Sequence, residues 1–270
     1  MHKIAVVGPG AMGCLFAARL ARSGVKVCLV DHRADRAARL ETSGITVESS
    51  GESLVARPSV TTGIPGGLDL IIVLTKAYTA PHLRFPPDTP VLTLQNGLGN
   101  VETLCATLGP GRVLVGTTSE ASTLLGEGHV RHTGSGETAL GAWTSAPSET
   151  ALESLRAAGF NVQATQAPGQ LVWEKVAVNA GINPLTAVLD VPNGRLVELT
   201  ETRQLMRDLV VEAAKVAATE GYHFQYSLVE HTEGVCRATA ENISSMLQDV
   251  RAGKQTEIDA ISGEILRRGQ

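Results

Sequence analysis

Continuous apolar runs of strand length alternate with amphipathic segments through the first part of the chain. The runs have the hydrophobicity of buried parallel strands and cover residues 3–7, 26–30, 68–74, 91–94 and 113–115. Segments with a helical period lie between or after them, at residues 11–24, 34–43, 100–108 and 148–158, and a closing strand is expected at 161–165. This alternation predicts an α/β domain with a mainly parallel sheet.

Two stretches of this part have an antiparallel pattern instead. Residues 45–47 and 54–56 flank the turn sequence SSGES and predict a hairpin. Residues 119–141 contain short strands separated by glycine turns. We expect the second stretch to form an antiparallel extension of the sheet.

Strand signals disappear after a linker at residues 166–169, and only helical patterns follow. They cover residues 170–189, 196–220, 227–240, 242–251 and 256–268. Gly221 suits the position just after a helix, and Thr256 with Asp259 suits a capping box. The pattern predicts an α/β domain at 1–166 followed by an all-α domain at 167–270.

A glycine-rich turn connects the first strand to the first helix. Gly8 permits the tight turn, Gly10 lets the backbone approach a pyrophosphate, and Gly13 lets the helix pack closely on the strand. The helix N-terminus then offers free N–H groups to the phosphates. We therefore predict a Rossmann-type dinucleotide-binding domain, whose cofactor contacts in this turn are Gly8, Pro9, Gly10, Ala11, Met12 and Gly13.

The residues after the second strand point to two different cofactors. Asp31 lies 18 residues after Gly13, near the position of an acid that accepts from the ribose hydroxyl of NAD. Arg33 follows closely and could pair with the additional phosphate of NADP. These residues also fit an ordinary charged loop, and at this stage the choice between NADP and NAD stays open.

A polar row crosses an otherwise apolar helix in the second domain. Lys175, Asn179 and Asn183 are four residues apart, which places them on one helical stripe at steps of about 6 Å. An ammonium and two amides on an apolar helix are costly unless a polar group meets them. A single solvated lysine is the commoner explanation, but the whole row is typical of half of an active site.

A second polar cluster lies in the sequence ATAENISSMLQD. Asn242 and Ser245 are three residues apart and are expected on one helix face. An N-cap and a surface serine would explain them equally well. Glu257 is expected in the first turn of the next helix, near its positive end.

Composition excludes several other classes of function. A net charge of −4 gives no general attraction to nucleic acid or to an anionic membrane. Four scattered cysteines suit reduced thiols in the cytoplasm. His129 and His132 lie in a predicted hairpin without a third ligand, so they are interpreted as surface residues and no metal is predicted.

The motifs along the chain resemble those of the 2-dehydropantoate 2-reductase (ketopantoate reductase) family. The resemblance runs from GPGAMG through LTK and QNG to KVAVNAGINPLTA, VPNG and TAENISSMLQDVRAGKQTEID, which is nearly the whole chain. It implies NADPH-dependent reduction of 2-dehydropantoate to (R)-pantoate, on the route to pantothenate and coenzyme A. It also implies a small-molecule 2-oxo acid as the partner, with a homodimer as one option for the assembly.

The resemblance assigns roles to individual residues. Lys175 is implied as the proton donor, and Lys76, Asn96 and Glu257 as cofactor-side positions together with the glycine turn. Ser122 falls near another cofactor contact. The implied substrate contacts are Asn96, Lys175, Asn179, Asn183, Asn193, Asn242 and Ser245.

Three features depart from the family pattern. Asp31-His32-Arg33 stands where the family often has an arginine, the segment AYTAPHLRFPPDTP is shorter and richer in proline, and relatives continue beyond Gln270. A helical domain shortened at its C-terminus is therefore expected. Two alternatives remain: a related reductase of another 2-oxo acid, and a nucleotide-sensing protein without turnover.

Overall fold

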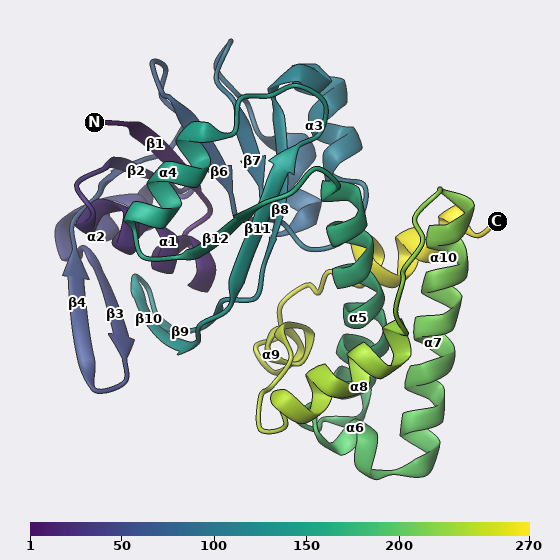
Figure 1. Ribbon diagram of the computed structural model, residues 1–270. Coiled ribbons are helices and arrows are strands. Elements are labelled where there is room, and N and C mark those ends of the chain that lie inside the picture. Colours follow the sequence, from purple (N-terminus) through teal and green to yellow (C-terminus); the bar gives the residue numbers. More distant parts are fainter. The chain divides into compact units, whose positions relative to one another are not determined.

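The computed structural model describes residues 1–270, which fold into two compact units (Figure 1). The first unit contains Met1–Gln95 and Asn100–Pro168, and the second contains Asn96–Gly99 and Gly169–Gln270. The sequence places the boundary two residues earlier, after Gln166, and gives no sign that Asn96–Gly99 belongs with the later helices. The loop that carries Asn96 is therefore part of the helical unit.

The first unit is built on an eight-stranded sheet in the order β12-β11-β8-β7-β6-β1-β2-β5. Six neighbouring strands are parallel and follow the chain order 3-2-1-4-5-6 of a dinucleotide-binding sheet. They are β1 (Lys3–Val7), β2 (Lys26–Val30), β5 (Ser59–Thr61), β6 (Leu70–Val73), β7 (Val91–Thr93) and β8 (Val113–Thr118). The Rossmann-type α/β class predicted from the alternating pattern is confirmed.

Two further strands complete the main sheet. β11 (Glu137–Ala142) pairs antiparallel with β8, and β12 (Asn161–Ala164) pairs parallel with β11. The helices of this unit are α1 (Ala11–Arg22), α2 (Ala34–Ser43), α3 (Asn100–Leu108) and α4 (Glu149–Ala157), with 3₁₀ turns at Ala77–His82 and Pro110–Arg112. The predicted strand ranges agree with these elements, but no strand was predicted at β5, which is too short to show a period.

A second, four-stranded sheet corrects part of the prediction for residues 119–141. Its order is β4-β3-β10-β9, from β3 (Ile45–Ser49), β4 (Glu52–Ala56), β9 (Ala121–Gly126) and β10 (His129–Gly134). β10 pairs in parallel with β3, so β9 and β10 join the hairpin of β3 and β4 instead of the main sheet. β11, at the end of the same stretch, does extend the main sheet antiparallel, as predicted. α1 packs on β1 and β2 and also on this smaller sheet, and Cys14, Leu15, Phe16 and Ala18 are fully buried there.

The second unit is helical. Its elements are α5 (Pro168–Leu189), α6 (Arg195–Glu198), α7 (Thr200–Thr219), α8 (Leu228–Ala238), α9 (Ser245–Arg251), a π-helical turn (Asp259–Gly263) and α10 (Glu264–Arg268). Its core surrounds Trp173 on α5, and Gly181 lets α7 approach, because a Cβ there would lie 2.7 Å from Val210 Cγ2. None of these helices combines the length and the apolarity that crossing a bilayer requires.

Three predictions for the helical unit need correction. The predicted helix 196–220 is divided at Leu199, whose backbone is extended. The predicted helix 242–251 begins only at Ser245, because Ser244 rather than Asn242 accepts from the Leu247 N–H. The predicted helix 256–268 passes through the π-helical turn, although Thr256 Oγ1 accepts from the Ile258 N–H at 3.4 Å.

Candidate active site

The glycine turn has the geometry that a dinucleotide requires. Gly8 has φ +105°, and a Cβ on it would lie 2.7 Å from Thr75 Cγ2. A Cβ on Gly13 would lie 1.8 Å from Gly8 O, so α1 is pressed against the turn. A Cβ on Gly10 would meet nothing within 4 Å. Gly8 and Gly13 are thus required by packing, whereas Gly10 faces open space in front of the helix.

No side chain of the helix occupies the N-terminus of α1, which is therefore open to an anion. Its first turn contains no acidic residue and its N-cap, Gly10, makes no side-chain hydrogen bond. Ala11 and Met12 are the first helical residues and are half-buried, while Pro9 is buried and its carbonyl accepts from Cys14 Sγ. Burial raises the pKa of Cys14 to about 12, so this thiol stays neutral and adds no charge. The residues present fit a dinucleotide pyrophosphate at the helix N-terminus.

Lys76 lies at the same edge of the sheet as the glycine turn. It follows β6, which pairs in parallel with β1, and its neighbour Thr75 is the residue against which Gly8 packs. The Lys76 carbonyl accepts from Gln95 Nε2 at 3.2 Å and from the Thr79 N–H at 3.0 Å. The structure therefore brings Lys76 and the turn together, as a shared cofactor site requires.

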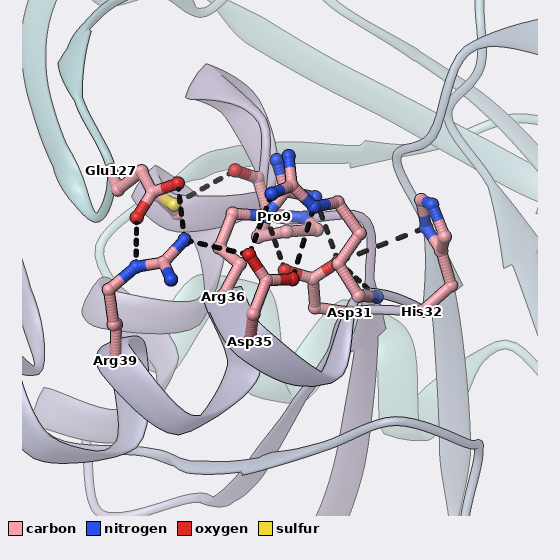
Figure 2. A network of polar contacts seen from close by, with 9 residues as sticks. Pro9, Asp31, His32, Asp35, Arg36, Arg39 and Glu127 are labelled. Carbon is pink, nitrogen blue, oxygen red and sulfur yellow. Dashed lines mark hydrogen bonds and ion pairs between the residues drawn. The ribbon is translucent and has the colours of Figure 1, made fainter.

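The side chains of Asp31 and Arg33 are both engaged in ion pairs, and the pair of Asp31 is drawn in Figure 2. The Asp31 carboxylate is buried and paired with Arg36, a residue that the sequence analysis did not consider. Arg33 is exposed and its guanidinium binds Asp35. Asp31 and Arg33 are therefore each held in an ion pair, with Arg36 and Asp35 respectively, and neither side chain is free to choose the cofactor alone.

Lys175, Asn96 and Glu257 form the first polar group of the helical unit. Glu257 is buried, Asn96 Nδ2 donates to its Oε2 at 3.4 Å, and its charge acts on Lys175. The loop of Asn96 is held there by a hydrogen bond from the Leu98 N–H to the Ala260 carbonyl, 2.8 Å long. These three predicted site residues, from distant parts of the sequence, are thus neighbours.

The proton affinity of Lys175 is set by burial. Burial lowers the pKa of its ammonium from 10.5 to about 8, although the Glu257 charge acts in the opposite direction. An ammonium with this pKa releases its proton more readily than a solvated lysine does. It is therefore suited to act as a general acid near neutral pH.

The rest of the α5 stripe leads to the N-terminus of α9. Asn179 is half-buried and Asn183 is buried. One turn later, the buried Thr186 hydroxyl lies 2.7 Å from Ser244 Oγ, the cap of α9. Sequence reasoning missed Thr186 and Ser244, although a serine three residues before Leu247 is an ordinary N-cap signal.

Asn193 belongs to a backbone clamp. Its Nδ2 donates to Thr239 Oγ1 at 2.9 Å, its N–H donates to the Asn242 carbonyl at 3.0 Å, and the Gly194 N–H donates to Ala240 at 3.0 Å. Its buried Oδ1 has no hydrogen-bond partner in the structure. The clamp fixes the segment that leads to Asn242.

Asn242 and Ser245 are both exposed, on either side of the start of α9. Asn242 lies outside the helix, so the predicted common helical face does not exist. Ser122 lies on β9, where its hydroxyl bonds the Arg131 carbonyl across the hairpin at 3.2 Å. None of these three positions is buried in the way that Asn183 is.

Comparison with known families also divides the chain into an N-terminal and a C-terminal part. The model described as "Ketopantoate reductase PanE/ApbA" matches residues 4–145, and its C-terminal counterpart matches residues 169–270. Together the two models span almost the whole chain.

The chain belongs to the ketopantoate reductase PanE/ApbA family.

Individual relatives and solved structures are similar to this chain over most of their length. The 2-dehydropantoate 2-reductase of Halobacterium salinarum is 36% identical, with 99% of this chain and 92% of the relative aligned. The crystal structure of 2-dehydropantoate 2-reductase from Geobacter metallireducens has a TM-score of 0.90 at 29% identity and covers 99% and 93% of the two chains. A ternary structure of D-mandelate dehydrogenase with NADH and anilino(oxo)acetate has a TM-score of 0.91 at 29% identity and covers 99% and 91%.

One residue of the first unit was placed wrongly from the sequence. His132 was interpreted as a surface residue, but its side chain is only 10% exposed and its Nε2 lies 2.5 Å from Glu120 Oε2. Arg19 is 3.8 Å from the same carboxylate. The pair joins β10 to the segment between β8 and β9, and it belongs to the packing of the first unit.

Proposed function

We propose that this protein reduces 2-dehydropantoate to (R)-pantoate with a nicotinamide cofactor, a step towards pantothenate and coenzyme A. The observation that carries the proposal is full-length similarity to relatives named 2-dehydropantoate 2-reductase in archaea and bacteria, at up to 36% identity. The nicotinamide cofactor is NADPH in this proposal. The first unit binds it and the helical unit holds the keto acid.

Lys175 has the chemistry that the reduction requires. A bound reduced nicotinamide would supply the hydride that the keto carbon of the substrate receives. The carbonyl oxygen then carries developing negative charge, which the Lys175 ammonium stabilises before donating its proton to that oxygen. The Glu257 carboxylate favours the protonated form of Lys175 and so opposes the effect of burial.

The amide residues of the helical unit would orient the substrate. Asn179 and Asn183 share the stripe of Lys175 and offer both donors and acceptors to a carboxylate and a hydroxyl. Asn96, Asn242 and Ser245 are proposed as further contacts. In this proposal Asn193 acts through its clamp on the Asn242 segment, and these residues contribute orientation rather than bond-breaking.

The similarity to D-mandelate dehydrogenase favours a second candidate, a reductase of an aryl 2-oxo acid. That neighbour has the highest TM-score of those reported above, 0.91. The same lysine chemistry would serve either substrate, because only the group beyond the 2-oxo acid differs.

Steady-state kinetics with matched keto acids test the assignment. We expect kcat/KM for 2-dehydropantoate to exceed that for phenylglyoxylate and for 2-oxoisovalerate by at least about 100-fold, since a site built for hydrogen bonding rejects substrates that lack the polar group. A larger kcat/KM for phenylglyoxylate would establish the second candidate. Cofactor binding without turnover of any keto acid would instead support a nucleotide-sensing protein.

The pH dependence of the reaction should report on Lys175. We expect kcat/KM for reduction to fall as pH rises through about 8, because the neutral amine has no proton to donate. Glu257→Gln removes the charge that raises this pKa, so the falling limb should move to lower pH in that variant. An unshifted limb in Glu257→Gln would contradict the coupling between the two residues.

The composition also supports proposals about the binding partners and the cellular location of the protein. We propose a cytoplasmic enzyme that acts on a small molecule and binds neither nucleic acid nor membrane, since all four cysteines are free thiols and the net charge is −4. A homodimer is the first assembly to test by size-exclusion chromatography with light scattering.

A further inference from the structure

We propose that Arg36 binds the 2′-phosphate of NADPH, and that Asp31 is a positioning residue for Arg36 rather than an acid that binds the ribose of NAD. The proposal rests on the proposed function only in taking a nicotinamide dinucleotide as the cofactor. It assigns cofactor selection to an ion pair that joins the end of β2 to the first turns of α2 (Figure 2).

The Asp31 carboxylate is already occupied. Arg36 Nη2 donates to Oδ1 at 2.8 Å, Arg36 Nε donates to Oδ2, and the Arg33 N–H donates to Oδ1 at 3.1 Å. The side chain is 0% exposed. An acid that selects NAD must offer its oxygens to the ribose hydroxyls. Asp31 cannot do so while Arg36 covers it.

The pair also removes the repulsion that an acid would exert on a phosphate. Burial acts to raise the pKa of Asp31, but the hydrogen bonds from Arg36 and Arg33 and the Arg36 charge outweigh it, so the pKa lies below its ordinary value. The carboxylate therefore stays ionised and holds the guanidinium, whose charge cancels its own. A 2′-phosphate would therefore approach an ion pair without net charge, in which the Arg36 guanidinium is on the solvent side.

Arg36 is placed to use its remaining donors. A guanidinium has five N–H groups, and two of them serve Asp31, which leaves three. Its side chain is 24% exposed while Asp31 is covered, so the guanidinium lies on the solvent side of the pair. Its charge also acts on Cys14 in the first turn of α1, whose Sγ contacts the Pro9 carbonyl, so Arg36 lies near the glycine turn. This is the location that the ribose end of a dinucleotide requires.

The two neighbouring arginines, Arg33 and Arg39, form ion pairs with other acidic residues. Arg33 donates twice to Asp35, at 3.3 and 2.7 Å. Arg39 donates to Glu127 at 2.7 and 2.9 Å and to Asp35 at 3.2 Å. Neither one touches Asp31 with its side chain. Arg39 therefore provides a matched control, with the same charge on the same helix one turn further along.

The test uses adenosine 2′,5′-bisphosphate (2′,5′-ADP) and ADP, isomers whose second phosphate is attached to the ribose 2′ oxygen and to the 5′ phosphate, respectively. Isothermal titration of the wild type should show tighter binding of 2′,5′-ADP. We expect Arg36→Gln to weaken 2′,5′-ADP at least tenfold while ADP changes less than about threefold, because a charge-assisted bidentate contact is lost. Arg39→Gln should leave the ratio within about twofold. No keto acid is present, so failure of the substrate assignment would not affect the result.

The reciprocal variant distinguishes the two roles of Asp31. We expect Asp31→Asn to leave the Kd of NADH within about threefold, because this carboxylate does not reach the ribose. A tenfold loss of NADH binding in Asp31→Asn, together with unchanged 2′,5′-ADP binding in Arg36→Gln, would overturn the proposal. Since Arg36→Gln leaves a buried carboxylate without its partner, the double variant Asp31→Asn/Arg36→Gln removes both charges. It should show the same loss of 2′,5′-ADP binding, and retention of wild-type binding there would also overturn the proposal.

Discussion

Replacing Lys175 by alanine is expected to lower kcat for ketopantoate reduction by about 10²–10⁴-fold, the range typical of a lost general acid. The Kd of NADPH, measured by titration of its fluorescence, should change by less than about twofold. The reason is that Lys175 belongs to the helical unit, whereas the glycine turn belongs to the first unit. Turnover and cofactor binding should therefore separate in this variant.

Two further variants identify what Lys175 contributes. Lys175→Arg keeps a positive charge but holds its proton at every accessible pH, so it should recover part of the electrostatic stabilisation without the falling limb near pH 8. Lys215→Ala removes an exposed lysine from α7 of the same unit and should leave kcat unchanged. Wild-type turnover in Lys175→Ala would remove Lys175 from the mechanism.

Local periodicity explains what could be predicted of the candidate site. Lys175, Asn179 and Asn183 share a stripe because α5 runs unbroken through Pro184, so a spacing of four residues was sufficient. The glycine turn was equally readable, since a strand, a turn and a helix follow one another within the first 22 residues. Both features depend only on neighbours in the sequence.

Contacts between distant residues could not be predicted in this way. The Asn96 loop joins the helical unit through a hydrogen bond from the Leu98 N–H to the Ala260 carbonyl. In the sequence, however, this loop lies between two segments of the first unit. Asn242 is an equally good N-cap by residue type, but Thr186 on α5 contacts Ser244 and α9 begins there. Tertiary contacts decide both cases.

The Asp31 region shows the same limit for function. The sequence gives residue types that favour either cofactor, and only the side-chain partners separate them. Arg36 is five residues from Asp31, across a loop and a helix start, so neither a helical nor a strand period relates the two. The structure supplies the pairing on which the cofactor proposal depends.

Replacing Gly13 by alanine is expected to have the second-largest effect, on both stability and cofactor binding. The new Cβ would lie 1.8 Å from Gly8 O, which is a backbone atom and cannot rotate away. We expect the free energy of unfolding to fall by about 3 kcal/mol, at the upper end of overpacking costs, even though alanine favours a helix more than glycine does. Thermal unfolding followed by circular dichroism should show a Tm lower by about 5–10 °C.

Gly10→Ala is the matched control, because its Cβ would enter open space and its φ of −77° suits alanine. The Tm should stay within about 2 °C of the wild type. Its Kd for NADPH should nevertheless rise, by about tenfold, since the pyrophosphate must approach the backbone at this position. Equal Tm values for the two variants would contradict the packing role of Gly13, and unchanged NADPH affinity in Gly10→Ala would remove the pyrophosphate from the space in front of α1. The pair therefore separates the glycine that the fold needs from the glycine that the cofactor needs.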